Sequence, residues 1–145
     1  VISSWENVFR LQLEFFAFSQ SNISSLSIFP KNTKHLTLGR DERFADFINE
    51  GQGCYLNHLT SLTLQFLNRL ERVEGLGDIP TLRLMGCDGI ISVKGLGRNH
   101  CVELVECAQL EDVSSLSTVP VVRIRSCPRV DSSCLLFVPR LKICD

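Results

Sequence analysis

The stretch CVELVECAQLEDVSSLSTVP, residues 101–120, is one full copy of a pattern that organises most of this sequence. Two apolar residues flank one polar residue near its start, and this pair recurs every 20 residues as Leu82/Leu84, Val102/Leu104 and Val122/Ile124. A cysteine follows three residues after each pair, and apolar residues then recur at every third position. The consensus LxLxxCxxLxxVxxLxxVPx is an internal repeat, and such a repeat determines the fold.

The same pattern accounts for the rest of the chain. Strand positions fit seven units, which begin at Leu11, Leu36, Leu62, Leu82, Val102, Val122 and Leu141. The first half keeps phase only with insertions, one around KNTKH (31–35) and one around INEGQG (48–53). We therefore expect a single domain over residues 1–145 with about six to seven repeats. Neither end has a polar capping unit, so we expect a segment of a longer chain, uncapped at both ends.

Two apolar residues with a polar residue between them are typical of a short strand with one buried face. One such unit cannot bury that face alone, so successive units stack and their strands pair in parallel. Behind each strand, the apolar period of three fits neither an α-helix nor a strand and indicates 3-10 turns or extended segments. The predicted fold is an α/β-type solenoid with a curved parallel sheet on its concave side and little α-helix.

These residues resemble leucine-rich repeat proteins over almost the whole chain. CVELVECAQL (101–110) and VVRIRSCPRV (121–130) are similar to the cysteine-containing strand-and-turn segment of such repeats. LEDVSSLSTV (110–119) is similar to the short back segment of internalin-like repeats, and residues 29–51 resemble FNIP repeats. The resemblance implies a curved array that binds other proteins on its concave sheet and has no catalytic residues of its own.

The cysteines that repeat in phase are Cys87, Cys107 and Cys127, and we interpret them as a structural ladder. In-phase side chains on neighbouring strands lie about 5 Å apart, so each S–H can donate to a carbonyl of the next coil. Leu67 occupies the same repeat position, which argues against a ligand role for the thiols. A buried thiol is also most often inert.

Other candidate chemistry has a structural explanation. His100 and Cys101 supply metal-binding atoms near Cys107, but their repeat positions diverge, whereas zinc needs four converging ligands. The two GLG triplets, 75–77 and 95–97, lack the third glycine of a phosphate loop and fit turns on the back of the solenoid. We therefore expect no catalytic residues, no metal, no cofactor and no enzyme activity.

Residues between and beside the buried pairs point to the concave face, where we expect a protein partner to bind. The candidate contact residues are Thr63, Gln65, Arg83, Met85, Glu103, Arg123, Arg125, Arg140 and Lys142. Because most charges among them are basic, an acidic protein or peptide is the expected partner. The alternative is that the sheet needs a polar face only for solubility. Nucleic acid fits less well, since no aromatic residues are interleaved with the basic ones.

Composition supports a globular protein without a membrane or nucleic-acid partner. The chain is 44% hydrophobic and 21% charged, with a net charge of -1. No apolar run approaches the length of a membrane-spanning helix. Seven cysteines without a CxxC motif favour a reducing, intracellular setting, although a secreted or surface location stays open. Two further functions remain alternatives, a structural segment packed in a larger assembly and a substrate-receptor module of a ubiquitin ligase.

Overall fold

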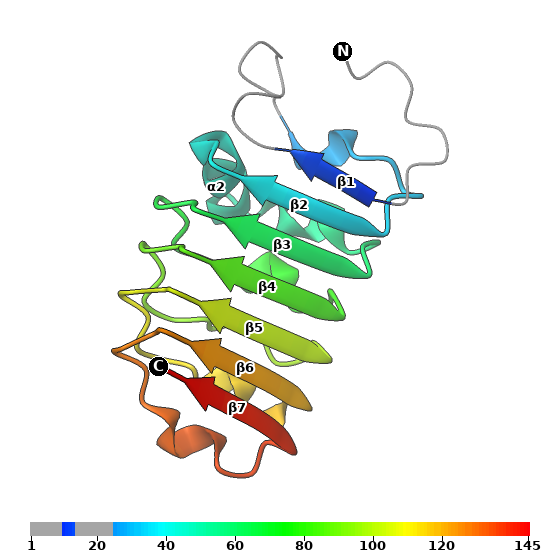
Figure 1. The fold of residues 1–145 in the computed structure, drawn as a ribbon. Coiled ribbons are helices and arrows are strands. Elements are labelled where there is room, and N and C mark those ends of the chain that lie inside the picture. The colour runs from blue at the N-terminus through cyan, green and yellow to red at the C-terminus, as the bar shows by residue number, and fades with distance from the viewer. Residues whose placement is uncertain (1–9, 14–24) are drawn as a thin grey trace.

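The computed structural model describes residues 25–145 and the backbone of one further strand at residues 10–13. Repeat positions expected in residues 1–9 and 14–24 lie outside the described residues. Seven strands form one sheet in chain order, and each is parallel to its neighbours (Figure 1). The strands are β1 (Arg10–Leu13), β2 (His35–Gly39), β3 (Ser61–Gln65), β4 (Thr81–Met85), β5 (Cys101–Val105), β6 (Val121–Arg125) and β7 (Arg140–Cys144). The predicted parallel sheet is confirmed. Each described strand starts at the same end of the sheet as its neighbours, as in a solenoid.

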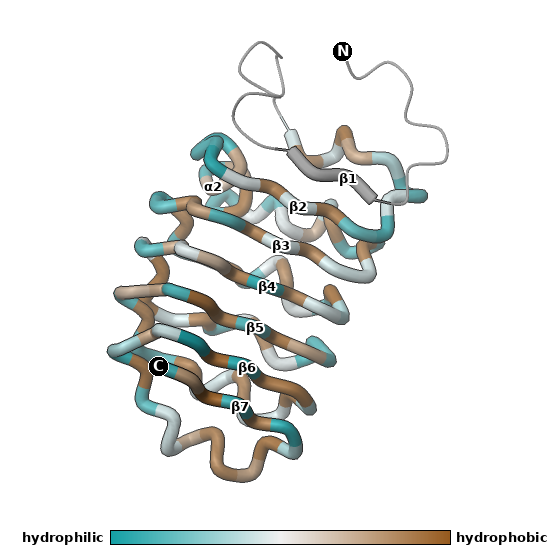
Figure 2. The backbone as a smooth tube through the Cα atoms, in the orientation of Figure 1, coloured by the Kyte–Doolittle hydropathy of each residue, from teal (hydrophilic) through white to brown (hydrophobic). Residues whose placement is uncertain are grey.

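The register of the sheet follows the repeat of the sequence. Leu62 pairs with Leu82, Leu82 with Val102, and Val102 with Val122. The last step is one residue shorter, so Val122 pairs with Leu141. Burial alternates along β3, β4 and β6, and along β5 up to its last residue, because the apolar pair of each strand points into the core while residues one, three and five point away from it. Figure 2 shows this alternation as hydrophobic and hydrophilic positions along the strands.

The back of each coil is short, as the apolar period of three predicts. The 3-10 helices are η1 (Leu26–Ile28), η2 (Gln52–Leu56), η3 (Glu74–Leu76), η4 (Ser114–Thr118) and η5 (Ser132–Leu135). Between β4 and β5 the chain is extended instead, and Ser92 forms an isolated parallel bridge with Asp112. Figure 1 shows the helical turns behind the sheet. The other face of the sheet, which we call the open face, is not covered by any helix or strand of residues 25–145.

Helix α2 (Glu42–Asn49) leads into the longer of the two insertions, around residues 48–53. Asp41 caps its first turn by accepting a hydrogen bond from the Arg43 backbone N–H at 3.1 Å. Asp41 follows Leu38 by three residues, as the cysteines follow the apolar pairs of later strands, but here the chain begins a helix. Gly51 follows the helix with φ of 92°, a left-handed conformation that favours glycine. Phe44 and Ile48, one helical turn apart, are buried against the core.

The extended return between β4 and β5 is held by a glycine and an asparagine. Gly95 has φ of 100°, and a Cβ there would lie 2.6 Å from the Cα of Glu74 on the previous coil. Asn99 is buried at a position that is apolar in other coils. Its amide donates to the carbonyls of Leu76 at 3.1 Å and Ile79 at 2.7 Å. The side chain thus bonds two carbonyls of the preceding coil and ties the two coils together.

Candidate functional site: the open face of the sheet

All nine residues that the sequence predicts for binding lie on the open face, on β3 to β7. They occupy the first, third and fifth positions of their strands, whose side chains alternate with the buried ones. The middle row runs in register through Thr63, Arg83, Glu103, Arg123 and Lys142. A second row runs through Gln65, Met85, Val105, Arg125 and Cys144. The sheet therefore brings the predicted residues together on one surface.

The centre of the middle row is an ion pair. Arg83 Nε lies 3.6 Å from Glu103 Oε1 on the neighbouring strand, and both side chains are partly exposed. That distance is beyond a good hydrogen bond, and the Nε atom is buried without a hydrogen-bond partner. The charge of Arg83 is therefore compensated by Glu103, and its Nε is closed off from an arriving acceptor.

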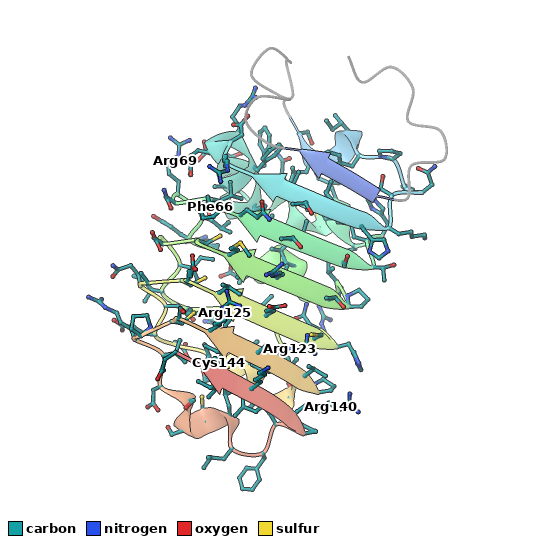
Figure 3. All side chains as sticks on the ribbon, viewed as in Figure 1. Phe66, Arg69, Arg123, Arg125, Arg140 and Cys144 are labelled. Carbon is teal, nitrogen blue, oxygen red and sulfur yellow. The ribbon has the colours of Figure 1, made fainter. Side chains whose placement is uncertain are left out.

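Beyond this pair, the open face is strongly basic. Four exposed cations lie on the last two strands, and we call them the basic quartet: Arg123, Arg125, Arg140 and Lys142. Figure 3 shows the three arginines around β6 and β7. Among the ion pairs of residues 25–145, none joins a quartet member to a carboxylate. The chain as a whole has a net charge of -1, so this part of the open face differs in charge from the average of the chain.

The row beside the quartet contains an apolar step. Met85 is half-buried, and Val105, which pairs with it in register, is only 2% exposed. Val105 occupies the fifth position of its strand, on the open face, yet it is almost fully buried. Its register neighbours in this row are Met85 and Arg125, both of which have longer side chains. The apolar surface offered to a partner is therefore mainly that of Met85.

The opposite row contains a contact that the sequence analysis did not anticipate. His35 Nδ1 lies 2.7 Å from Ser61 Oγ, since both residues are first in adjacent strands. A hydroxyl beside an imidazole is the first element of a nucleophile–base pair. Among the described hydrogen bonds, His35 has no carboxylate partner to orient the ring and stabilise its charged form. As it stands, the contact is a hydrogen bond between neighbouring polar side chains.

The three in-phase cysteines form a ladder behind the open face. Each thiol lies near the carbonyl of the fourth residue of the preceding strand, with Sγ–O distances of 3.8, 3.8 and 3.7 Å for Cys87, Cys107 and Cys127. Each also lies 3.4–3.6 Å from the last carbonyl of its own strand. The thiols therefore donate to carbonyls near the ends of the strands, as the repeat predicts. All seven cysteines of the chain are free thiols.

The ladder thiols differ in acidity because their surroundings differ. Burial raises the pKa of Cys87 to about 11. Cys107 shares a hydrogen bond with Cys127, and this bond together with burial raises the pKa of Cys107. The same hydrogen bond stabilises the Cys127 thiolate and lowers the pKa of Cys127 to about 7. Cys127 is also only partly buried, beside a cavity of about 490 Å³.

Alkylation should therefore distinguish the rungs. We expect iodoacetamide to modify Cys127 in the folded protein about tenfold faster at pH 8 than at pH 6, because the thiolate is the nucleophile and its fraction rises through a pKa near 7. Cys87 and Cys107 should stay unmodified. Peptide mass spectrometry at timed quenches measures each site, and the exposed Cys54 reports reagent activity. A Cys127 rate that is flat between these pH values would contradict the assignment.

Comparisons with known proteins give no relative. The sequence matches no model of a known protein family, and neither the curated proteins nor the solved structures yield a match. Within residues 10–13 and 25–145, no helix has the length and apolar character needed to cross a bilayer. In the same residues, no three histidine, cysteine or acidic side chains converge as a metal site would require.

Proposed function

We propose that this chain is a leucine-rich repeat solenoid that binds an acidic protein or peptide on the open face of its sheet. The basic quartet is the observation that carries this proposal. Uncompensated like charges on adjacent strands repel one another, which costs stability unless an anionic partner neutralises them. A partner that carries Asp and Glu side chains supplies that charge and is attracted from a distance.

Two further features of the open face support binding by a protein. The quartet adjoins the Arg83–Glu103 ion pair and the apolar Met85, so charged, hydrogen-bonding and apolar contacts lie within one surface. The strands are regular and parallel, so these side chains stand on a rigid base and lose little backbone entropy when a partner binds. A rigid surface with mixed contacts is typical of a binding module, whereas the described residues contain no complete set of catalytic groups.

A peptide-display selection tests the proposal. We expect the enriched peptides to carry an excess of Asp and Glu over the starting library. Replacing Arg123 and Arg125 together by glutamate should weaken binding of the strongest peptide at least tenfold, because attraction becomes repulsion at β6. Binding should also weaken between 50 and 500 mM salt, since exposed charge pairs are screened. Fluorescence anisotropy measures each dissociation constant.

A matched control has the same charge change elsewhere. Arg98 and Arg129 form ion pairs with Asp78 and Glu111 and lie in the connections between strands. Their joint replacement by glutamate should leave the peptide affinity within about twofold, because both residues lie away from the strands of the open face. The fold should also be kept, since surface ion pairs contribute little to stability. Enriched peptides without acidic bias, or equal loss in both double variants, would show that the quartet is not the binding site.

A further inference from the structure

The geometry of the basic quartet points to a more specific ligand, and we propose that it binds a phosphoryl group borne by a side chain of the partner. This inference rests on the proposed function, since it names the anionic group that the same open face takes. Within the quartet, Arg123 and Lys142 are direct register partners on β6 and β7. Strand spacing places their backbones about 4.8 Å apart. Arg125 and Arg140 extend from opposite ends of this central pair.

The arrangement in space favours a group with acceptors in three dimensions. Arg125 lies two residues beyond Arg123 on β6, and Arg140 lies two residues before Lys142 on β7. Two residues correspond to about 7 Å along a strand, a span that an arginine side chain can reach back across. Donors thus approach the Arg123–Lys142 pair from both sides and from both strands. A phosphoryl group has three acceptor oxygens directed apart, which suits such an approach.

The charge of the basic quartet also favours a phosphoryl group over a carboxylate. A carboxylate carries one negative charge and two coplanar oxygens, so a single bidentate arginine satisfies it. Four cations without an ion-paired carboxylate leave excess charge around such a ligand. A phosphomonoester carries a charge of about −1.5 to −2 at pH 7. Three of the four cations are arginines, whose planar guanidinium groups match phosphate oxygens in pairs.

A phosphodiester of nucleic acid is the less favoured source of phosphate. Its charge is single, and its bases need aromatic platforms to stack on. Among the open-face positions of β2 to β7, no residue is aromatic apart from the imidazole of His35, which is engaged with Ser61. The quartet is also compact and does not continue along the sheet, since Thr37 and Thr63 occupy the equivalent places on β2 and β3. A partner-borne monoester fits this compact site.

Three synthetic dodecapeptides test the inference. They consist of glycine, alanine and two glutamates and differ only at one central residue, which is serine, glutamate or phosphoserine. We expect the phosphoserine peptide to bind the complete chain at least tenfold more tightly than the glutamate peptide, with the serine peptide weakest. Amide chemical-shift changes should centre on β6 and β7. Replacing Arg123 and Lys142 by alanine should remove the preference, whereas Arg129→Ala should keep it.

The pH dependence is an independent readout. The second phosphate pKa is about 6, so the affinity of the phosphoserine peptide should rise between pH 5 and pH 7 as the dianion forms. The glutamate peptide, already ionised across this range, should show a flat profile. A phosphoserine profile as flat as that of glutamate would overturn the inference, because the second charge would then contribute nothing.

The other outcomes separate the two proposals. Equal affinity for glutamate and phosphoserine overturns the phosphoryl inference but leaves an acidic partner in place. Inorganic phosphate that binds as tightly as the phosphopeptide overturns a partner-borne group in favour of a free anion. Tighter binding of a single-stranded RNA 12-mer than of every peptide overturns both the inference and the proposed function. Failure of all the peptides, together with a display selection that has no acidic bias, also overturns both.

Discussion

Replacing Leu104 by alanine is expected to lower the free energy of unfolding by about 2–5 kcal/mol. Leu104 is fully buried on β5 and pairs in register with Leu84 on one side and Ile124 on the other. The substitution removes apolar surface and leaves a cavity that the flanking coils cannot fill, because their own side chains are fixed by the same packing. A repeat array is stabilised through neighbouring units, so the loss affects the contacts with both neighbours.

Urea unfolding followed by far-ultraviolet circular dichroism measures this change. The control is Leu136→Ala, since Leu136 is 75% exposed and its removal should change stability by less than about 0.5 kcal/mol. A Leu104→Ala variant as stable as the control would mean that the core between β4 and β6 is not packed as described.

Gly95→Ala is expected to lower the free energy of unfolding by a comparable amount, for two reasons that can be tested separately. Gly95 has φ of 100°, a conformation that costs an alanine about 1–2 kcal/mol. In addition, the new Cβ would lie 2.6 Å from the Cα of Glu74, so the extended return and the preceding coil must move apart. We expect a total loss of about 3 kcal/mol or more, with overpacking supplying about 1–3 kcal/mol of it.

Gly51→Ala isolates the conformational part of this loss. Gly51 has φ of 92°, and a Cβ there meets no atom within 4 Å. Its replacement should therefore cost about 1–2 kcal/mol, the strain alone. Thermal unfolding of both variants gives the difference. If Gly95→Ala is no worse than Gly51→Ala, the two coils are not in close contact at Glu74.

Much of the sheet could be predicted because the repeat has a fixed length. Once Leu82 and Val102 are recognised as equivalent, their pairing in the sheet follows, and so does the alternation that exposes Arg83 and Glu103. The same reasoning placed the cysteine ladder. The His35–Ser61 contact was also within reach, because both residues are first in neighbouring strands.

Other features depend on local interactions that break the repeat. Helix α2 interrupts the repeat, and the local signals that favour it are Asp41, a good capping residue, and Gly51, a good helix terminator. The role of Asn99 could not be predicted, because the carbonyls of Leu76 and Ile79 come within reach of its amide only in the finished fold. The near-complete burial of Val105 could not be predicted either, because the repeat places the fifth residue of each strand on the open face.

The strands are evenly spaced, and this spacing selects how far apart the anionic side chains of a bound peptide must lie. Neighbouring strands lie about 4.8 Å apart, whereas side chains on one side of an extended peptide recur about every 6.8 Å. The side chains of a peptide laid across the strands therefore come back into line with the strands only after three strand spacings, about 14 Å. This length corresponds to four residues of the peptide. Arg83 on β4 and Lys142 on β7 are three strands apart in the same row. Two anionic side chains four residues apart would meet both at once, whereas a pair two residues apart would fall between strands.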